Sequence, residues 1–156
     1  MCVVADPPTF IPMFKPADPE HQKFKPVLDW VMAGSGKFVM GGSRYTEELR
    51  AMKSILSHLS QLEKKGKVIR KREAEVDVEE SLVKGIEPAK DFDDPHLVAL
   101  IRLTGCRLIC VRDPRSHKFL LAKYLYHSIG DRPKLYTGAK KNSKLLSARN
   151  IASCCR

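Results

Sequence analysis

Cys2-Val3-Val4-Ala5-Asp6 is a short apolar run that ends in an acid. Because the strands of a parallel sheet are buried on both faces, a continuous apolar run of this kind is typical of them. The run Arg107-Leu108-Ile109-Cys110-Val111 has the same character and is followed by Asp113-Pro114. Two buried strands that each lead into an aspartate predict an α/β protein with acids at the carboxyl ends of its strands.

Strand and helix patterns alternate along the rest of the chain. Apolar residues recur at helical spacing from Phe24 to Met32, and a longer amphipathic stripe predicts one helix that begins with Ser43 as N-cap and ends at Gly66. The prolines from Pro7 to Pro19 predict an extended loop. Further strands are predicted at 37–40, 67–70 and 134–136, and further helices at 79–84, 97–103 and 119–125. This alternation predicts a mostly parallel sheet with helices on both faces.

Composition indicates one globular domain with a basic surface. The chain has 156 residues and a formal net charge of +10, and its basic residues are concentrated locally. The region 64–72 has six basic residues and no acidic one, and the region 132–156 has seven and none. Such a field attracts polyanions, although a solvated basic face without a partner has the same composition. We expect a domain at 1–139 and a basic C-terminal tail at 140–156.

Leader and membrane signals are absent from the sequence, which predicts a cytoplasmic protein that does not cross a membrane. The five cysteines match no zinc-site spacing and no disulfide framework, so we expect reduced thiols.

Two further acids are predicted to face the strand ends. In open parallel sheets the functional crevice lies beyond the carboxyl ends of the strands, where the strand order reverses. Asp6 and Asp113 each lie at such an end, and Glu48 lies in the first turns of the helix that follows the second strand. Asp94 precedes Pro95 at the start of a helix. Each acid also has a simpler interpretation as a turn residue, a helix cap or a solvated charge.

Carboxylates gathered in one cleft point to a divalent cation. Like charges raise one another's pKa, so several carboxylates cannot all stay ionised without a compensating charge. Mg²⁺ is bound by oxygen ligands, commonly carboxylates together with waters and substrate phosphates. Such an ion polarises a phosphodiester and lowers the pKa of a bound water. Asp6, Glu48, Asp94 and Asp113 therefore predict a site for a hard divalent cation such as Mg²⁺ and, with the basic regions, suggest phosphodiester hydrolysis; Glu47 and Asp93 are alternatives to their neighbours.

The order of these segments resembles the PIN-domain family from about residue 2 to residue 136. The family's first and fourth motifs are apolar strands that lead to an Asp, matched by Val3-Val4-Ala5-Asp6 and by the run from Gly105 to Asp113. Its second motif is a Glu before Leu in a helix, matched by Glu48-Leu49, and its third is matched by Asp94-Pro95-His96-Leu97-Val98-Ala99.

The resemblance implies a three-layer α/β/α sandwich that binds Mg²⁺ or Mn²⁺ and cuts RNA as an endoribonuclease. Asp6 and Asp113 would be the principal metal ligands, and Glu48 and Asp94 would complete the site or orient the attacking water. Many bacterial members of the family are toxins that are held inactive by a small antitoxin protein and are often homodimeric. Arg112 and Arg115 flank the fourth acid, where they could hold a phosphate or merely pair with a carboxylate. With Lys140 and Lys141, they are the residues that we expect to contact RNA.

One departure from the family pattern favours a second hypothesis. The family usually has a small polar residue two positions after its first Asp, whereas this chain has Pro7-Pro8 after Asp6. The side chain that would help to orient the metal cluster is missing, unless the Thr9 hydroxyl replaces it. The alternative is a catalytically impaired PIN-like module that binds nucleic acid or a protein partner. His96 follows the third-motif acid and could be a ligand, but we expect a surface residue at the start of a helix.

A phosphotransfer enzyme or receiver domain would also have Asp at strand ends. A phosphotransfer enzyme of the haloacid-dehalogenase type needs a second Asp at the position of Pro8, and a receiver domain needs an acidic pair near its first strand. The sequence has neither feature, so we rank this class below the other two.

Overall fold

Five parallel strands form the centre of the protein, in the order β3-β2-β1-β4-β5. The structure is a computed structural model that describes residues 2–34, 36–150 and 152. The strands are β1 (Cys2–Ala5), β2 (Lys37–Gly41), β3 (Val68–Lys71), β4 (Leu108–Cys110) and β5 (Lys134–Tyr136). All five lie where the sequence predicted them, and the sheet is parallel throughout.

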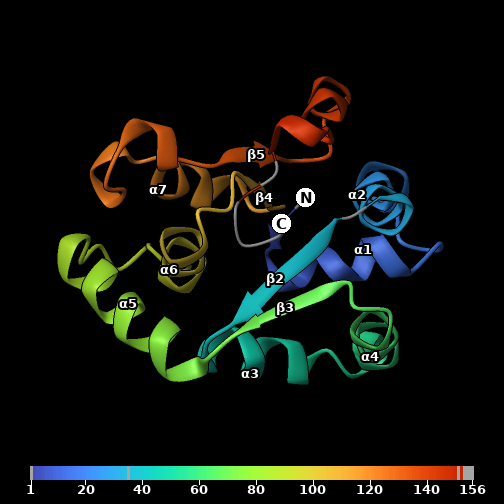
Figure 1. Cartoon of the computed structure of the whole chain (residues 1–156), viewed down its shortest axis with the longest axis horizontal. Coiled ribbons are helices and arrows are strands. Elements are labelled where there is room, and N and C mark those ends of the chain that lie inside the picture. Colours follow the sequence, from blue (N-terminus) through green and yellow to red (C-terminus); the bar gives the residue numbers. More distant parts are fainter. Residues whose placement is uncertain (1, 35, 151, 153–156) are drawn as a thin grey trace.

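Helices cover both faces of the sheet, which gives a three-layer α/β/α sandwich (Figure 1). On one side lie α1 (Phe10–Phe14), α2 (His21–Ala33) and α4 (Leu56–Lys64), and on the other α5 (Glu73–Ile86), α6 (Pro95–Thr104) and α7 (His117–Leu120). The helix α3 (Ser43–Ala51) follows β2. Short 3-10 turns occupy Pro7–Thr9, Lys53–Ile55, Pro114–Ser116, Lys123–Leu125, Ile129–Asp131, Lys140–Leu145 and Ala148–Asn150.

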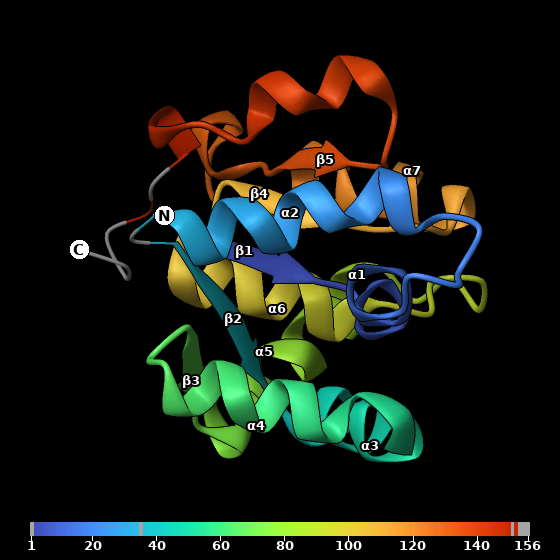
Figure 2. The ribbon, with the colours of Figure 1, turned by 90° about the vertical axis from the view of Figure 1, so that its right-hand side faces the viewer.

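The strand order reverses beside β1. From β1 the chain adds β2 and then β3 on one side, and after α5 and α6 it adds β4 and β5 on the other (Figure 2). In a doubly wound sheet of this kind, the crevice for a ligand opens at the carboxyl ends of the two strands where the order changes. Here those strands are β1 and β4, which are the two strands that lead into Asp6 and Asp113.

Burial explains why these apolar runs become the central strands. All four residues of β1 have no exposed surface, and Val4 is paired with Val39 of β2 and Ile109 of β4. A strand with neighbours on both edges and helices over both faces has no polar side, which is why its sequence does not alternate.

Two predictions about the first half of the chain were wrong. The proline-rich segment is not fully extended, because Pro7–Thr9 forms a 3-10 turn and α1 follows directly. Proline fits the first turn of a helix, where its missing N–H has no hydrogen-bond partner to lose. The predicted long helix is broken into α3 and α4 at Met52, whose ψ of 63° is not helical.

Beyond the break, the apolar stripe no longer keeps one buried face, and Leu56 is 39% exposed while Ile55 is fully buried. The helix expected at 79–84 is also longer than predicted, since α5 extends from Glu73 to Ile86. The helix expected at 119–125 is instead the short α7 followed by a 3-10 turn.

The start of α3 is tied to α5 by a close approach. Gly42 has a φ of 91°, and a Cβ atom there would lie 2.7 Å from Cγ1 of Val76, so only glycine fits. Ser43 is the first helical residue rather than the N-cap. Its N–H and hydroxyl donate hydrogen bonds of 2.8 and 2.6 Å to the carboxylate of Asp77 in α5. The side chain of Asp77 therefore satisfies the N-terminus of α3.

The C-terminal segment packs on the rest of the protein. Leu145 and Leu146 contact the core, and Asn150 is buried, where its Oδ1 accepts a hydrogen bond of 3.1 Å from Lys134 of β5. Cys2 is disulfide-bonded, so the expectation of reduced thiols was wrong for this residue. In the part of the chain that the structure describes, no helix combines the length and the apolar character needed to cross a membrane.

Candidate active site

Asp6 and Asp113 lie at the same edge of the sheet. Asp6 follows β1 directly, and its N–H donates a hydrogen bond of 2.9 Å to the carbonyl oxygen of Cys110, the last residue of β4. Asp113 lies three residues beyond Cys110. The fold therefore brings the two strand-end acids to neighbouring positions, as the parallel arrangement predicts.

Glu48 and Asp94 reach the same edge from two helices. Because β2 ends at Gly41 and α3 begins at Ser43, the first turns of α3, with Glu48, lie at the carboxyl ends of the strands. The helix α6 leads into β4. A helix that leads into a parallel strand runs against it, so the N-cap residue of α6, Asp94, also lies at this edge. No group of the helix binds the Asp94 side chain as a cap.

The pKa values of Asp6 and Asp94 show that the four acids interact. Burial, followed by the charges of Asp94, Glu48 and Asp113, raises the pKa of Asp6 to about 8, against a smaller lowering by Arg112. Burial and then Glu48 raise the pKa of Asp94 to about 6, with Asp113 contributing in the same direction. Carboxylates distant in sequence are close enough in space to destabilise one another's charged forms.

Asp6 is the most buried of the four acids. It is 6% exposed, and among the described residues no group donates a hydrogen bond to its carboxyl oxygens. The Thr9 hydroxyl, considered above as an orienting group, donates its hydrogen bond of 2.6 Å to the backbone carbonyl of Asp6. A buried carboxylate without a partner is costly to ionise, so this side chain calls for a cation when it is charged.

Two of the four acids are instead paired with arginines. Glu48 accepts a hydrogen bond of 3.2 Å from Nε of Arg44, which lies one turn earlier in α3. Asp113 accepts bonds from the backbone and the guanidinium of Arg115, and these bonds hold its pKa below the ordinary value. Within residues 2–34, 36–150 and 152, no group of three or more His, Cys, Asp or Glu side chains is arranged to hold an ion.

The donor set nevertheless suits a hard divalent cation in its chemistry. It consists of carboxylates, and the most buried of them, Asp6, has no protein cation bonded to it. Oxygen ligands and negative charge are what Mg²⁺ and Mn²⁺ require. Binding of an ion would require Glu48 and Asp113 to exchange their arginine partners for it.

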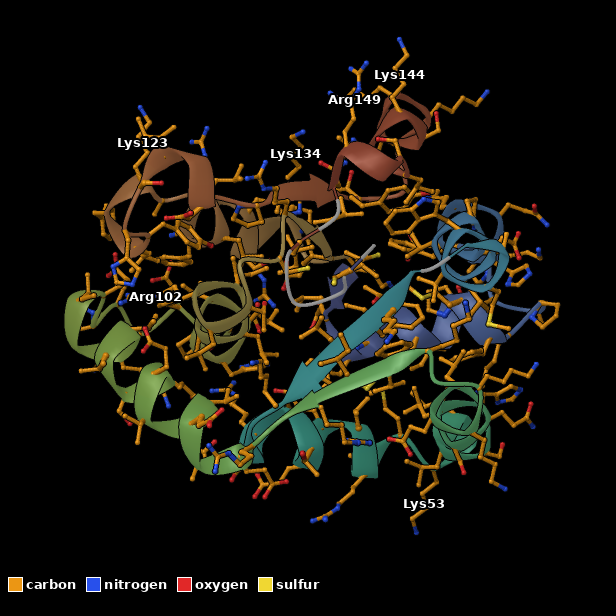
Figure 3. All side chains as sticks on the ribbon, in the orientation of Figure 1. Lys53, Arg102, Lys123, Lys134, Lys144 and Arg149 are labelled. Atoms are coloured by element: carbon orange, nitrogen blue, oxygen red, sulfur yellow. The ribbon has the colours of Figure 1, made fainter. Side chains whose placement is uncertain are left out.

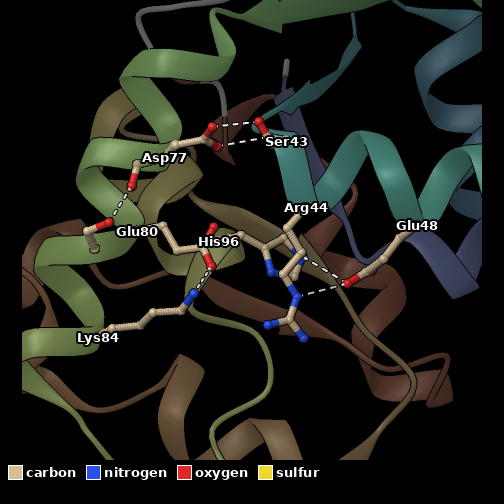
Figure 4. A network of polar contacts seen from close by, with 8 residues as sticks. Ser43, Arg44, Glu48, Asp77, Glu80, Lys84 and His96 are labelled. Atoms are coloured by element: carbon tan, nitrogen blue, oxygen red, sulfur yellow. Dashed lines mark hydrogen bonds and ion pairs between the residues drawn. The ribbon is translucent and has the colours of Figure 1, made fainter.

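His96 was wrongly expected to be a surface residue. It has no exposed surface, and its Nε2 lies 3.9 Å from Oε1 of Glu48 (Figure 4). Neither ring nitrogen has a hydrogen-bond partner among the described residues. Burial, with Arg44 and Lys84 nearby, lowers the pKa of His96 to about 3, so the ring is neutral. Its place in an otherwise apolar helix is the signal that could have indicated burial.

The basic residues that were predicted to contact RNA lie in different surroundings. Arg112 forms an ion pair of 2.7 Å with Glu20, and Arg115 is bound to Asp113. Lys140 lines a shallow groove with Tyr136 and Lys23, and Lys141 follows it on the surface. The alternative acids Glu47 and Asp93 are both exposed. Their neighbours Glu48 and Asp94 are partly buried and remain the candidates for the site.

Comparison with known proteins adds no further information about the class. No protein-family model matches the chain, and neither a curated protein nor a solved structure matches it. What the chain itself defines is a doubly wound α/β protein with a cluster of carboxylates at the strand-order switch point.

Proposed function

We propose that this protein is a metal-dependent endoribonuclease of the PIN-domain type. The observation that supports this most directly is Asp6, a buried carboxylate at the switch point whose charge is opposed by three other acids. Carboxylates gathered in one place destabilise one another's charged forms, and a bound divalent cation would relieve this and supply the chemistry for phosphodiester hydrolysis. The strand order, and the location of all four acids at the carboxyl ends of the strands, support the same proposal.

In this proposal Asp6, Glu48, Asp94 and Asp113 hold Mg²⁺ or Mn²⁺. Such an ion, when bound, lowers the pKa of a water molecule and stabilises the oxygen that leaves the phosphorus atom. The protein's own part is to gather the ligands and to bury Asp6. The side chain of Asp94 is not used as a helix cap, which supports a role for it in completing the metal site or orienting the attacking water.

RNA is the proposed substrate because the surface is basic and the family resemblance points to it. Lys134, Lys144 and Arg149 project from the same side of the molecule, around β5 and the C-terminal segment (Figure 3). A surface of this sign attracts the phosphate backbone. The cytoplasmic location remains a prediction from the sequence, and we propose an antitoxin partner and a homodimer on the resemblance alone.

Cleavage of single-stranded RNA by the purified protein tests the proposal. We expect the wild type to cut in Mg²⁺ or Mn²⁺ and not in EDTA, and Asp6→Asn to lose at least 100-fold in rate, about 2.7 kcal/mol of transition-state stabilisation. Asp29→Asn, at an exposed position of α2, is the matched control and should cut normally. A wild type that leaves varied RNAs intact with either metal would refute the enzymatic proposal.

A module that binds RNA without cutting it is the second candidate, and one observation favours it. The hydroxyl of Thr9 is engaged with the backbone, so after Pro7-Pro8 no described side chain orients the Asp6 carboxylate. This alternative predicts that RNA binding is the same with and without EDTA and that no product forms in either case. Calorimetric titration with Mn²⁺ separates the two further, because only the nuclease requires ion binding that Asp6→Asn abolishes.

A further inference from the structure

Arg44 lies beside the acids, yet sequence reasoning did not select it. Its Nε donates to Oε1 of Glu48 at 3.2 Å, and its charge also lowers the pKa of Asp94. The side chain is 40% exposed. A cation that interacts with two of the proposed ligands and still reaches solvent is well placed to meet an anion that enters the site.

The two outer nitrogens of the Arg44 guanidinium have no hydrogen-bond partner among the described residues. These atoms, Nη1 and Nη2, are directed away from Glu48 in Figure 4. The other two arginines near the acids use theirs, since Nη2 of Arg112 pairs with Glu20 at 2.7 Å and Nη2 of Arg115 pairs with Asp113 at 2.6 Å. Among these three arginines, Arg44 is the one in which both outer nitrogens are outside any ion pair between described residues.

The neighbouring cationic and N–H groups are already in use. Lys84 pairs with Glu80 at 2.6 Å, and the carboxylate of Asp77 occupies the N-terminus of α3 (Figure 4). A helix N-terminus is often an anion site, but this one already has an anion of its own. Donors for a phosphate group near Glu48 must therefore come from a side chain.

We propose that Arg44 binds a phosphate of single-stranded RNA beside the carboxylate cluster, an inference that rests on the proposed function. Before an ion binds, the bond from Nε to Glu48 orients the guanidinium and leaves its outer donors facing solvent. A planar pair of N–H donors matches two oxygens of one phosphate. Arg44 would thus position the substrate, in a role that we had predicted for Arg112 and Arg115.

Equilibrium binding without metal tests this role separately from catalysis. Anisotropy of a fluorescein-labelled single-stranded RNA, titrated in EDTA at several KCl concentrations, gives the Kd and its salt dependence. For Arg44→Ala we expect a Kd raised about 10-fold or more, the scale of a charge-assisted hydrogen bond, and a salt slope smaller by about 0.7, the value for one phosphate contact on a single strand. Arg44→Lys should keep the slope but lose part of the affinity.

Arg50→Ala is the matched control, because Arg50 is an exposed arginine on the same helix. It should change the Kd and the slope much less than Arg44→Ala. Glu48→Gln removes the negative charge beside Arg44 but keeps a side-chain oxygen that can accept the hydrogen bond from Nε, and it should not weaken RNA binding. Far-ultraviolet circular dichroism verifies folding, and Arg44→Lys provides the reading if the alanine variant does not fold.

Two outcomes would overturn the inference. One is an Arg44→Ala protein that binds as the wild type does with an unchanged slope, and the other is an equal loss in Arg50→Ala. If RNA is cut in an Asp6-dependent manner but Arg44→Ala binds normally, the nuclease proposal stands and this inference fails. If nothing is cut but Arg44→Ala alone weakens binding, the inference stands and the catalytic proposal fails.

Discussion

The ends of β1 and β4 occupy equivalent places in the fold but give their aspartates opposite properties. Asp6 is buried among other acids, and its pKa is raised to about 8. Asp113 lies at the adjacent strand end, yet hydrogen bonds from Arg115 lower its pKa. Topology therefore decides which side chains meet at the edge of the sheet, whereas burial and the nearest partner decide what each one can do.

The largest effect that separates the two ends is expected from Asp6→Asn. Below pH 3.8, the ordinary pKa of an aspartate, Asp6 is protonated in both the folded and the unfolded protein. As the pH rises from there to about 8, the unfolded chain releases a proton that the folded protein retains, so stability falls. Because the asparagine side chain does not titrate, the variant avoids this loss of stability, which is about 1.4 kcal/mol for each pH unit between the two pKa values. Urea unfolding at pH 5 and pH 9 should show a variant several kcal/mol more stable than the wild type at the higher pH.

Equal differences between variant and wild type at both pH values would contradict the raised pKa. Asp29→Asn serves again as the control, since its carboxylate is exposed.

An intermediate effect is expected from His96, which, like Asp6, is a buried titratable residue near the acid cluster. The lowered pKa keeps the folded ring neutral down to about pH 3, whereas the unfolded ring takes up a proton below 6.5. The contribution of His96 to stability should therefore fall by about 1.4 kcal/mol per pH unit as the pH drops through this window, a slope opposite in sign to that of Asp6. His96→Gln should remove this slope in urea unfolding between pH 6.5 and 4.5, and His127→Gln, at an exposed position, should retain it.

The smallest effect is expected from Asp113→Asn. A group whose folded pKa is lowered adds stability above its ordinary pKa and loses it as the pH falls through the folded value. Asp113 and Arg115 are largely exposed, with side chains 39% and 82% accessible, so solvent screens their attraction. The urea midpoint at pH 7 should not change measurably, even if cleavage is lost. A clear loss of stability would show that the Arg115 pair supports the β4 end.

The strand ends were predictable from sequence because their signal is local. An apolar run that stops at an acid, as in Val3-Val4-Ala5-Asp6, identifies both the buried strand and the residue at its carboxyl end. The parallel arrangement then brings Asp6 and Asp113 to one edge without further information. Glu48 and Asp94 followed from the same reasoning, because helices that join parallel strands run against them.

The surroundings of these acids could not be predicted in this way. The pairing of Glu48 with Arg44, the burial of His96 and the capping of α3 by Asp77 depend on contacts between elements that are distant in sequence or on side-chain orientation. The break at Met52 was missed because the apolar spacing continues across it, although the backbone does not. Periodicity reports which residues are apolar, and only packing decides whether a helix stays continuous.

The two outer strands of the sheet bear on how the protein behaves at high concentration. An exposed strand edge can add the strand of another molecule and so begin aggregation. β3 is short and carries Arg70 and Lys71, with Lys67 just before it, while β5 is three residues long and is bonded through Lys134 to the chain that follows it. A second molecule approaching β3 edge to edge would bring like charges together, so this edge of the sheet resists the addition of a further strand.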